Sequence, residues 1–210
     1  MSESLNFNYG SQEPNYNNLP TLSVGDKPWN QGPLLHQHLE VDNEFADKLN
    51  KEAVEKFNEL LKQNPEQALK EMVRYVIDLT PSDNYPEWVK HASEGISLSE
   101  AAKNKWCLCF HRAIAFQLLS EKLDKKIIQS AVIEGKWMEG DKYEMHLYNK
   151  VRVPPQNKIY LADASFLDTD ASPLIKDITD QTGTVQNIRL ANGDERIYTG
   201  NIAEYYKHFT

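Results

Sequence analysis

Apolar residues recur every three or four positions in two stretches of the first half of the chain. Residues 45 to 61 carry apolar side chains at helical spacing, and the pair Asn64-Pro65 stops the run. A second run covers residues 66 to 79 and ends before Pro81, because the residue that precedes a proline avoids the helical conformation. We expect two amphipathic helices that cover one face of the core.

The middle of the chain predicts two further helices after a loop at residues 82 to 95. Ser97 and Glu100 have the spacing of a capping box, in which each side chain satisfies a backbone N–H at the start of a helix. The following helix covers residues 109 to 123 and shows an apolar face. We expect this helix, which starts at Cys109, to be buried in the centre of the fold.

After Asp124 the hydrophobic period changes from that of helices to that of strands. Strands are expected at residues 127 to 133, 143 to 153 and 159 to 164, with turns at residues 135 to 141 and 154 to 157. Asn192-Gly193 lies between two short apolar runs and predicts a hairpin, which adds two strands. Short connections favour antiparallel neighbours. Helices followed by strands indicate an α+β fold with helices packed on an antiparallel sheet.

Residues 1 to 35 are rich in Asn, Pro, Gly and Ser and show no period, which predicts an extended or disordered arm. The remaining residues, 36 to 210, are within the size that one core organises, so we expect a single domain there. Three roles stay open for the arm. It covers a cleft, it serves as the delivery segment of a secreted bacterial protein, or it stabilises the core as an ordered tail, which we favour.

The net charge of −8 argues against a nucleic-acid or membrane surface, because both need clustered Lys and Arg. A protein or peptide substrate with a basic or neutral face fits better. No stretch approaches the roughly 20 apolar residues of a membrane span, and the N-terminus lacks the basic and apolar regions of a secretory signal. We therefore expect a cytoplasmic protein, with a secreted bacterial effector that has no cleavable signal as the alternative.

The chain contains two cysteines, Cys107 and Cys109, with one residue between them. That spacing is too short for an unstrained disulfide or for the Cys-x-x-Cys pattern of zinc and redox sites. Cys109 would lie at a helix N-terminus, where unpaired N–H groups and a partial positive charge stabilise a thiolate. His146 could serve as its base, and Asp163 could fix the tautomer of the imidazole. Cys107 is expected to be structural.

Other polar residues give weaker indications. His36 and His38 could be two metal ligands on a strand, but no Cys, Asp or Glu cluster accompanies them, so we favour a solvated arm and expect no metal or cofactor. Arg112 is expected to pair with a carboxylate or a carbonyl and so lock the helix. His111 is a candidate for substrate contact. It is not a candidate base, since a residue two positions from Cys109 faces another side of the helix.

These motifs resemble those of the transglutaminase-like superfamily of papain-type enzymes. In that family a Cys begins a helix with Ala four residues later, a His opens a strand motif that ends in Val, and an Asp closes the next strand before a small residue. The matching residues are Cys109 with Ala113, His146 with Val151, and Asp163 with Ala164-Ser165. His146 follows Cys109 by 37 residues and Asp163 follows His146 by 17, spacings similar to the family's. The Cys-x-His-Arg-Ala form is similar to a subgroup found in bacterial transglutaminase-like proteins and in the regulatory domain of some Raf-like plant kinases.

The resemblance implies a papain-like α+β fold whose central helix starts at a catalytic Cys109, with His146 and Asp163 completing a triad. It implies acyl transfer from amide bonds of proteins or peptides, as a protease, a glutamine deamidase or a transglutaminase. Substrate contacts would come from His111, Trp106 and Tyr148, with a place in the core as the alternative for Trp106.

The chain departs from the family at two positions. It has Tyr148 where the family commonly has Trp, and no Gly precedes Cys109. A second hypothesis is therefore a catalytically inactive domain that serves as a protein-binding module. A third is that Cys109 is a small buried residue and His146 a half-exposed strand residue. The order and spacing of the three residues favour the catalytic triad.

Overall fold

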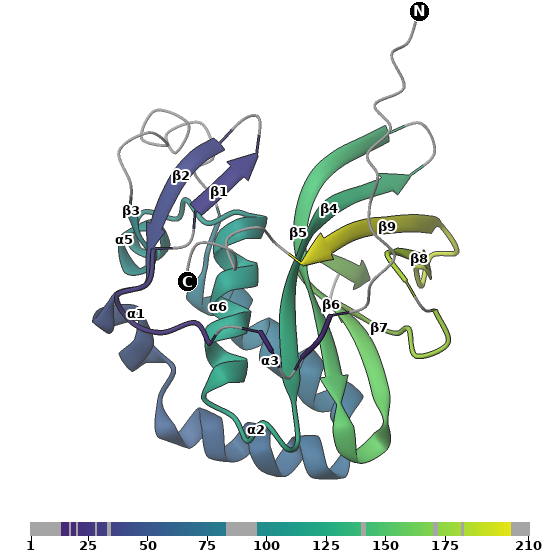
Figure 1. Cartoon of the computed structure of the whole chain (residues 1–210), viewed down its shortest axis with the longest axis horizontal. Helices are drawn as coiled ribbons and strands as arrows, with labels where there is room; N and C mark the ends of the chain where they lie inside the picture. Colours follow the sequence, from purple (N-terminus) through teal and green to yellow (C-terminus); the bar gives the residue numbers. More distant parts are fainter. Residues whose placement is uncertain are drawn as a thin grey trace, which may run out of the picture.

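A computed structural model of the chain describes residues 14–16, 18–19, 21–27, 29–32, 35–82, 96–139, 142–169, 172–181 and 183–202. It has a mixed α+β fold in which a curled antiparallel sheet lies beside several helices (Figure 1). The predicted α+β class is confirmed at this level. Among the described residues, no helix is both long and apolar enough to cross a membrane.

The helices come mainly from the first half of the chain. They are α1 (Asn43–Lys48), α2 (Lys51–Gln63), α3 (Pro65–Leu79), α5 (Leu98–Lys103) and α6 (Cys109–Glu121), with a 3-10 turn at Pro154–Gln156. Helix α6 packs against strands β4 and β5 of the sheet, and α3 packs against β6 and β7. The helix that starts at Cys109 therefore lies against the middle of the sheet.

The strands form two sheets. Their bounds are β1 (Trp29–Gly32), β2 (Leu35–Glu40), β3 (Ile96–Ser97), β4 (Gln129–Glu139), β5 (Lys142–Val153), β6 (Lys158–Thr169), β7 (Ser172–Asp177), β8 (Val185–Arg189) and β9 (Glu195–Ile202). The large sheet has the order β7-β6-β5-β4-β9-β8 and is antiparallel throughout. The small sheet has the order β1-β2-β3, and its β2–β3 pair is parallel.

Side-chain caps explain where the helices begin. The single helix predicted over residues 45 to 61 is wrong, because the structure divides it into α1 and α2. Asn50 accepts the N–H of Ala53 at 2.9 Å and so starts α2. Asn64 caps α3 in the same way, and Ser97 caps α5 by accepting the N–H of Glu100 at 3.2 Å. The predictions of α3, α5 and α6 are confirmed.

The strands agree with the sequence in part. Strand β5 and the hairpin between β8 and β9 are confirmed, and Gly193 in that hairpin has the positive φ of +94° that the turn requires. The turn predicted at residues 135 to 141 is wrong, because β4 continues to Glu139. Strand β6 also extends beyond residue 164, and β7 was not predicted.

Alternate residues of the strands point into two apolar cores on opposite faces of the sheet. Val132 and Leu147 belong to the core shared with the helices. Their chain neighbours Ile133 and Tyr148 belong to a second core on the other face, together with Tyr198 of β9. Period-2 alternation therefore places successive residues on opposite faces, so the buried apolar residues of a strand belong to one core or the other. Residue 146, two positions before Tyr148, faces the second core.

Part of the predicted arm is in contact with the domain. Leu22 is only 3% exposed and belongs to the helix-side core, and Asp26 accepts the backbone N–H of Val41 at 2.9 Å. Residues 29–32 pair with β2, the strand that contains His36 and His38. Most of the predicted loop at residues 82 to 95 lies outside the described residues.

Candidate active site

Cys109 is the first residue of α6, and the turn before it is held by a side chain of the same helix. The Nδ1 atom of His111 accepts the backbone N–H of Leu108 at 3.1 Å. An acceptor nitrogen carries no proton, and the ring is fully buried. Burial, together with the nearby charge of Arg112, lowers the pKa of His111 to about 3. A neutral imidazole therefore acts as the cap that positions the helix start.

Arg112 joins this end of α6 to two other elements. Its Nε donates to the carbonyl of Thr80 at 3.2 Å, after the last residue of α3. Its Nη1 donates to the carbonyl of Ala164 at 3.3 Å, in β6 directly after Asp163. The prediction that Arg112 pairs with a carbonyl to lock the helix is confirmed. The guanidinium also links the first turn of α6 to the strand that carries Asp163.

His146 and Asp163 meet across the sheet, from β5 and β6. The Nε2 atom of His146 lies 2.7 Å from Oδ2 of Asp163, and the two residues are 3% and 0% exposed. Asp163 Oδ1 accepts the backbone N–H of Ser165 at 2.9 Å. Tyr198 of β9 donates its hydroxyl to Oδ2 at 2.9 Å. Three donors therefore hold one buried carboxylate in a fixed orientation.

The sulfur of Cys109 reaches the same imidazole. Cys109 forms a side-chain hydrogen bond with His146 and a second one with the backbone N–H of Leu147. Since Nε2 of His146 is turned to Asp163, Nδ1 is the ring atom left for the thiol. Cys109 is partly exposed, whereas His146 and Asp163 are buried. The structure thus brings the three predicted residues together, and we call them the Cys–His–Asp cluster.

The charges in the cluster favour a thiolate and an imidazolium. Burial opposes charge on His146, but the carboxylate of Asp163 and the sulfur of Cys109 outweigh it and raise the pKa of His146 to about 10. Burial also opposes charge on Cys109. The hydrogen bond and the charge of His146 outweigh it, so the pKa of the Cys109 thiol lies below its ordinary value. At a pH above the pKa of the Cys109 thiol and below about 10, Cys109 is a thiolate and His146 an imidazolium.

The second cysteine lies in a different environment. Cys107 is buried in the helix-side core, and burial raises the pKa of its thiol to about 12 despite the neighbouring Arg112. A thiol with that pKa stays protonated at neutral pH and does not act as a nucleophile. The expectation that Cys107 is structural agrees with this environment.

The other predicted site residues are buried or pack against an apolar core. His111 is fully buried and caps the helix, as described above. Tyr148 is 1% exposed, and its hydroxyl donates to Oε1 of Gln186 at 3.2 Å in the second core. Trp106 is partly buried and packs against the helix-side core. His111 and Tyr148 thus have structural contacts, and the substrate contacts of these residues stay a prediction.

Sequence reasoning missed a group of residues around His146. The ring of Phe166 lies 5.0 Å from that of His146, and the ring of Tyr198 lies 6.2 Å from it. The guanidinium of Arg196 lies over Phe166 at 4.6 Å and over Trp137 at 5.0 Å. No motif marks these residues, because β4, β6 and β9 meet only through the sheet. Together they exclude water from this side of the His146 imidazole.

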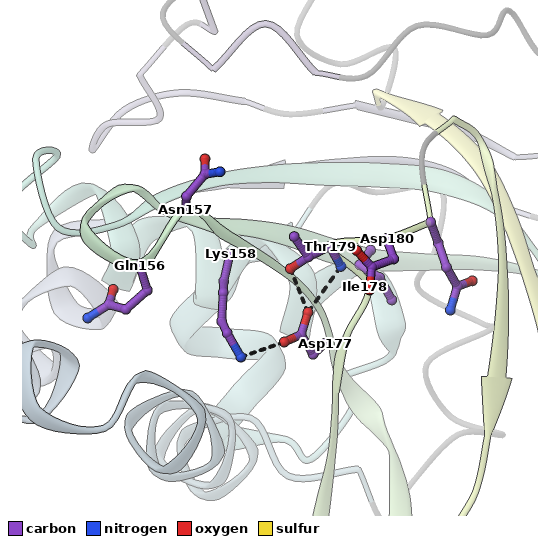
Figure 2. Close-up of a pocket in the computed structure, with 8 residues that line it drawn as sticks. Gln156, Asn157, Lys158, Asp177, Ile178, Thr179 and Asp180 are labelled. Carbon is purple, nitrogen blue, oxygen red and sulfur yellow. Dashed lines mark hydrogen bonds and ion pairs between the residues drawn. The ribbon is translucent and has the colours of Figure 1, made fainter.

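A surface hollow lies where β6 begins and β7 ends (Figure 2). It is lined by Gln156, Asn157, Lys158, Asp177, Ile178, Thr179, Asp180 and Gln181. Lys158 precedes Asp163 by five residues, about 17 Å along a strand. Lys158 Nζ lies 2.7 Å from Asp177 Oδ2, and the Thr179 hydroxyl donates to Oδ1 at 2.6 Å. These groups bind one another, and the hollow is separate from the Cys–His–Asp cluster.

Comparison with known proteins finds no family model that matches this chain and no curated protein that matches it. The grounds for a function are therefore the α+β fold and the geometry of Cys109, His146 and Asp163.

Proposed function

We propose that this protein is a cysteine-dependent acyl-transfer enzyme that acts on amide bonds of proteins or peptides. Cys109 is the nucleophile, His146 the general acid and base, and Asp163 the group that orients the imidazole. The observation that carries the proposal is the 2.7 Å contact between His146 Nε2 and Asp163 Oδ2, on the ring that also binds the Cys109 sulfur. That order of nucleophile, base and orienter is the arrangement on which activated thiols depend.

The site supplies the groups that amide chemistry needs. The thiolate attacks the carbonyl carbon, and the resulting oxyanion lies near the backbone N–H of Cys109, which has no intrahelical acceptor at the first position of α6. When the C–N bond breaks, the imidazolium of His146 gives its proton to the departing nitrogen. A thioester on Cys109 remains. His146, now neutral, accepts a proton from the second nucleophile as that nucleophile attacks the thioester.

The second nucleophile decides the reaction class. Water releases an acid, which makes the enzyme a protease when a peptide bond is cleaved and a deamidase when a glutamine side chain is attacked. A primary amine makes it a transglutaminase. All three outcomes pass through the same thioester. No cofactor takes part in any of these steps.

The fold proposal follows from the same elements. We propose a papain- and transglutaminase-like arrangement, with α6 as the central helix and β5 and β6 as the strands that carry the base and the orienter. Its support is the position of α6, whose N-terminus faces an antiparallel sheet and whose length packs on β4 and β5. Asn149 of β5 reinforces this contact, because its Nδ2 donates to the carbonyl of Ala113 in α6 at 3.3 Å.

The test is incubation of the purified protein with a cell proteome, with and without an added primary amine. Mass spectrometry then reports cleavage, deamidation or amine incorporation. Cys109→Ala should abolish every such product, because it removes the nucleophile. Cys107→Ala is the matched control, since it removes the neighbouring buried thiol, and it should keep the products. Wild-type protein that yields no product beyond the Cys109→Ala background would refute the enzyme and favour a protein-binding module.

A further inference from the structure

The Cys–His–Asp cluster continues into β9 through a fourth buried residue. Tyr198 is 0% exposed, and its hydroxyl donates to Oδ2 of Asp163 at 2.9 Å. The same oxygen atom of Asp163 binds His146. The hydroxyl of Tyr198 and the imidazole of His146 therefore share the charge of one carboxylate oxygen.

Arg196 carries a positive charge that acts on the Tyr198 hydroxyl. That charge favours the ionised phenol and so opposes the effect of burial on the pKa of Tyr198, while Arg196 Nε donates to Oε2 of Glu139 at 2.8 Å. A cation close to the phenol oxygen makes the phenol O–H a stronger donor toward Asp163. Charged and polar groups thus interact in sequence from Glu139 through Arg196 and Tyr198 to Asp163.

We propose that Tyr198, polarised by Arg196, is a positioning residue that draws charge from Asp163 and so sets the alkaline pH at which the Cys109–His146 pair loses its proton. The proposal rests on the proposed function, because it deepens the role of the same cluster. Because Oδ2 accepts from Tyr198 as well as from His146, it attracts the imidazolium proton less strongly than it would if it bound His146 alone. Tyr198 therefore keeps the imidazolium acidic enough to release its proton to a leaving group.

The charged and titratable groups that face the cluster come from three elements. Cys109 and Arg112 lie on α6, His146 on β5, and Tyr198 and Arg196 on β9. Arg112 acts on Asp163 through its charge, and its hydrogen bonds go to backbone carbonyls. Among the described residues, the Tyr198 hydroxyl is the one group besides His146 that hydrogen-bonds Oδ2, so its removal changes that oxygen most directly.

The experiment measures the rate of Cys109 alkylation by iodoacetate against pH. The rate should fall at alkaline pH when the imidazolium that attracts this anionic reagent is lost. Tyr198→Phe removes one hydroxyl and keeps the ring, so the charge on Asp163 Oδ2 rises and His146 holds its proton more tightly. The alkaline limb of the profile, which is the pH range where the rate falls, should therefore move up by about one pH unit. The NMR titration of the His146 imidazole should move by the same amount.

Tyr148→Phe is the matched control. It removes another buried tyrosine hydroxyl, whose ring lies 5.1 Å from that of Tyr198 but which binds Gln186 in place of Asp163. Its alkaline limb should equal that of the wild type. Tyr198→3-fluorotyrosine gives the opposite test, because a more acidic phenol donates more strongly and should move the limb down.

An unchanged limb in Tyr198→Phe, or an equal shift in Tyr148→Phe, overturns the proposal and leaves Tyr198 a structural residue. If Tyr198→Phe does not fold, the fluorotyrosine variant decides by the sign of its shift. Alkylation needs no substrate. The inference can therefore fail while acyl transfer is observed, and acyl transfer can be absent while the limb still shifts as predicted.

Discussion

Two buried histidines in this chain differ in charge because their partners differ. His146 faces the carboxylate of Asp163, which overcomes burial and raises its pKa to about 10. His111 faces a backbone N–H, which needs an unprotonated nitrogen, and burial together with the charge of Arg112 lowers its pKa to about 3. The residue type alone therefore does not fix the role. One ring is a proton carrier and the other is a helix cap.

The buried neutral ring of His111 should make the free energy of unfolding fall in acid. Between pH 6.5 and about 3 the unfolded chain binds a proton at His111 that the folded chain does not, so stability falls as the pH falls through that window. The slope reaches about 1.4 kcal/mol per pH unit. His111→Gln keeps an acceptor for the Leu108 N–H but does not titrate. Urea unfolding should show that the free energy of unfolding falls between pH 7 and pH 4 by about 2 to 3 kcal/mol less in this variant than in the wild type.

His111→Ala serves as the control for packing, because it removes both the acceptor and the buried ring. It should already be destabilised at pH 7 by about 2 to 4 kcal/mol. The acid dependence is the decisive observation. A His111→Gln variant with the same pH dependence as the wild type would show that His111 is not held neutral by the fold.

At the scale of elements, the sequence predicts the helices and strands that local residues determine. It does not predict the features that depend on contacts between distant parts of the chain. The sequence predicts helix α3 because its apolar period is continuous and Pro81 ends it, and the structure adds Asn64 as its cap. The sequence does not reveal the break between α1 and α2, because the apolar period continues across it. The break comes from the non-helical conformation of Leu49 and from Asn50, which caps α2. Strand β7 was missed because its pairing with β6 is irregular and its six residues give a weak period.

The extent of β4 also depends on its neighbours. Gly135 lies in the middle of that strand, paired with His146 of β5 and with Gly200 of β9. A Cβ atom on Gly135 would lie 1.6 Å from the carbonyl oxygen of Thr199 and 2.5 Å from the Cα of Gly200. The sequence suggests a turn at this glycine, whereas the structure uses it for the close approach of two strands beside the Cys–His–Asp cluster.

Gly135→Ala should therefore be strongly destabilising. The added methyl group meets backbone atoms, which cannot move aside without separating β4 from β9, so the free energy of unfolding should fall by about 3 kcal/mol or more. Gly193→Ala is the comparison, since Gly193 has open space around it and only a positive φ. It should cost about 1 to 2 kcal/mol. Equal losses in urea denaturation would contradict the close approach of these strands.

At the scale of the whole molecule, the cluster exists only where the helices meet the sheet. Cys109 begins α6, His146 and Asp163 lie on adjacent strands, and Arg112 binds carbonyls of Thr80 and Ala164 across that boundary. The three residues were predictable because their order, spacing and local motifs are written in the sequence. Tyr198 was not, because only the strand order β5-β4-β9 brings it to Asp163.

The central claim is that folding pairs a Cys109 thiolate with a His146 imidazolium. The most direct measurement is the rate of Cys109 alkylation by iodoacetamide against pH, in a Cys107→Ala background that leaves a single thiol. We predict half-maximal reactivity at a pH below the ordinary thiol range, since the imidazolium stabilises the thiolate. In His146→Ala the transition should move to the ordinary thiol range, above about pH 8, or higher because of burial. A wild-type transition already in that range, or one that His146→Ala leaves unchanged, would contradict the claim.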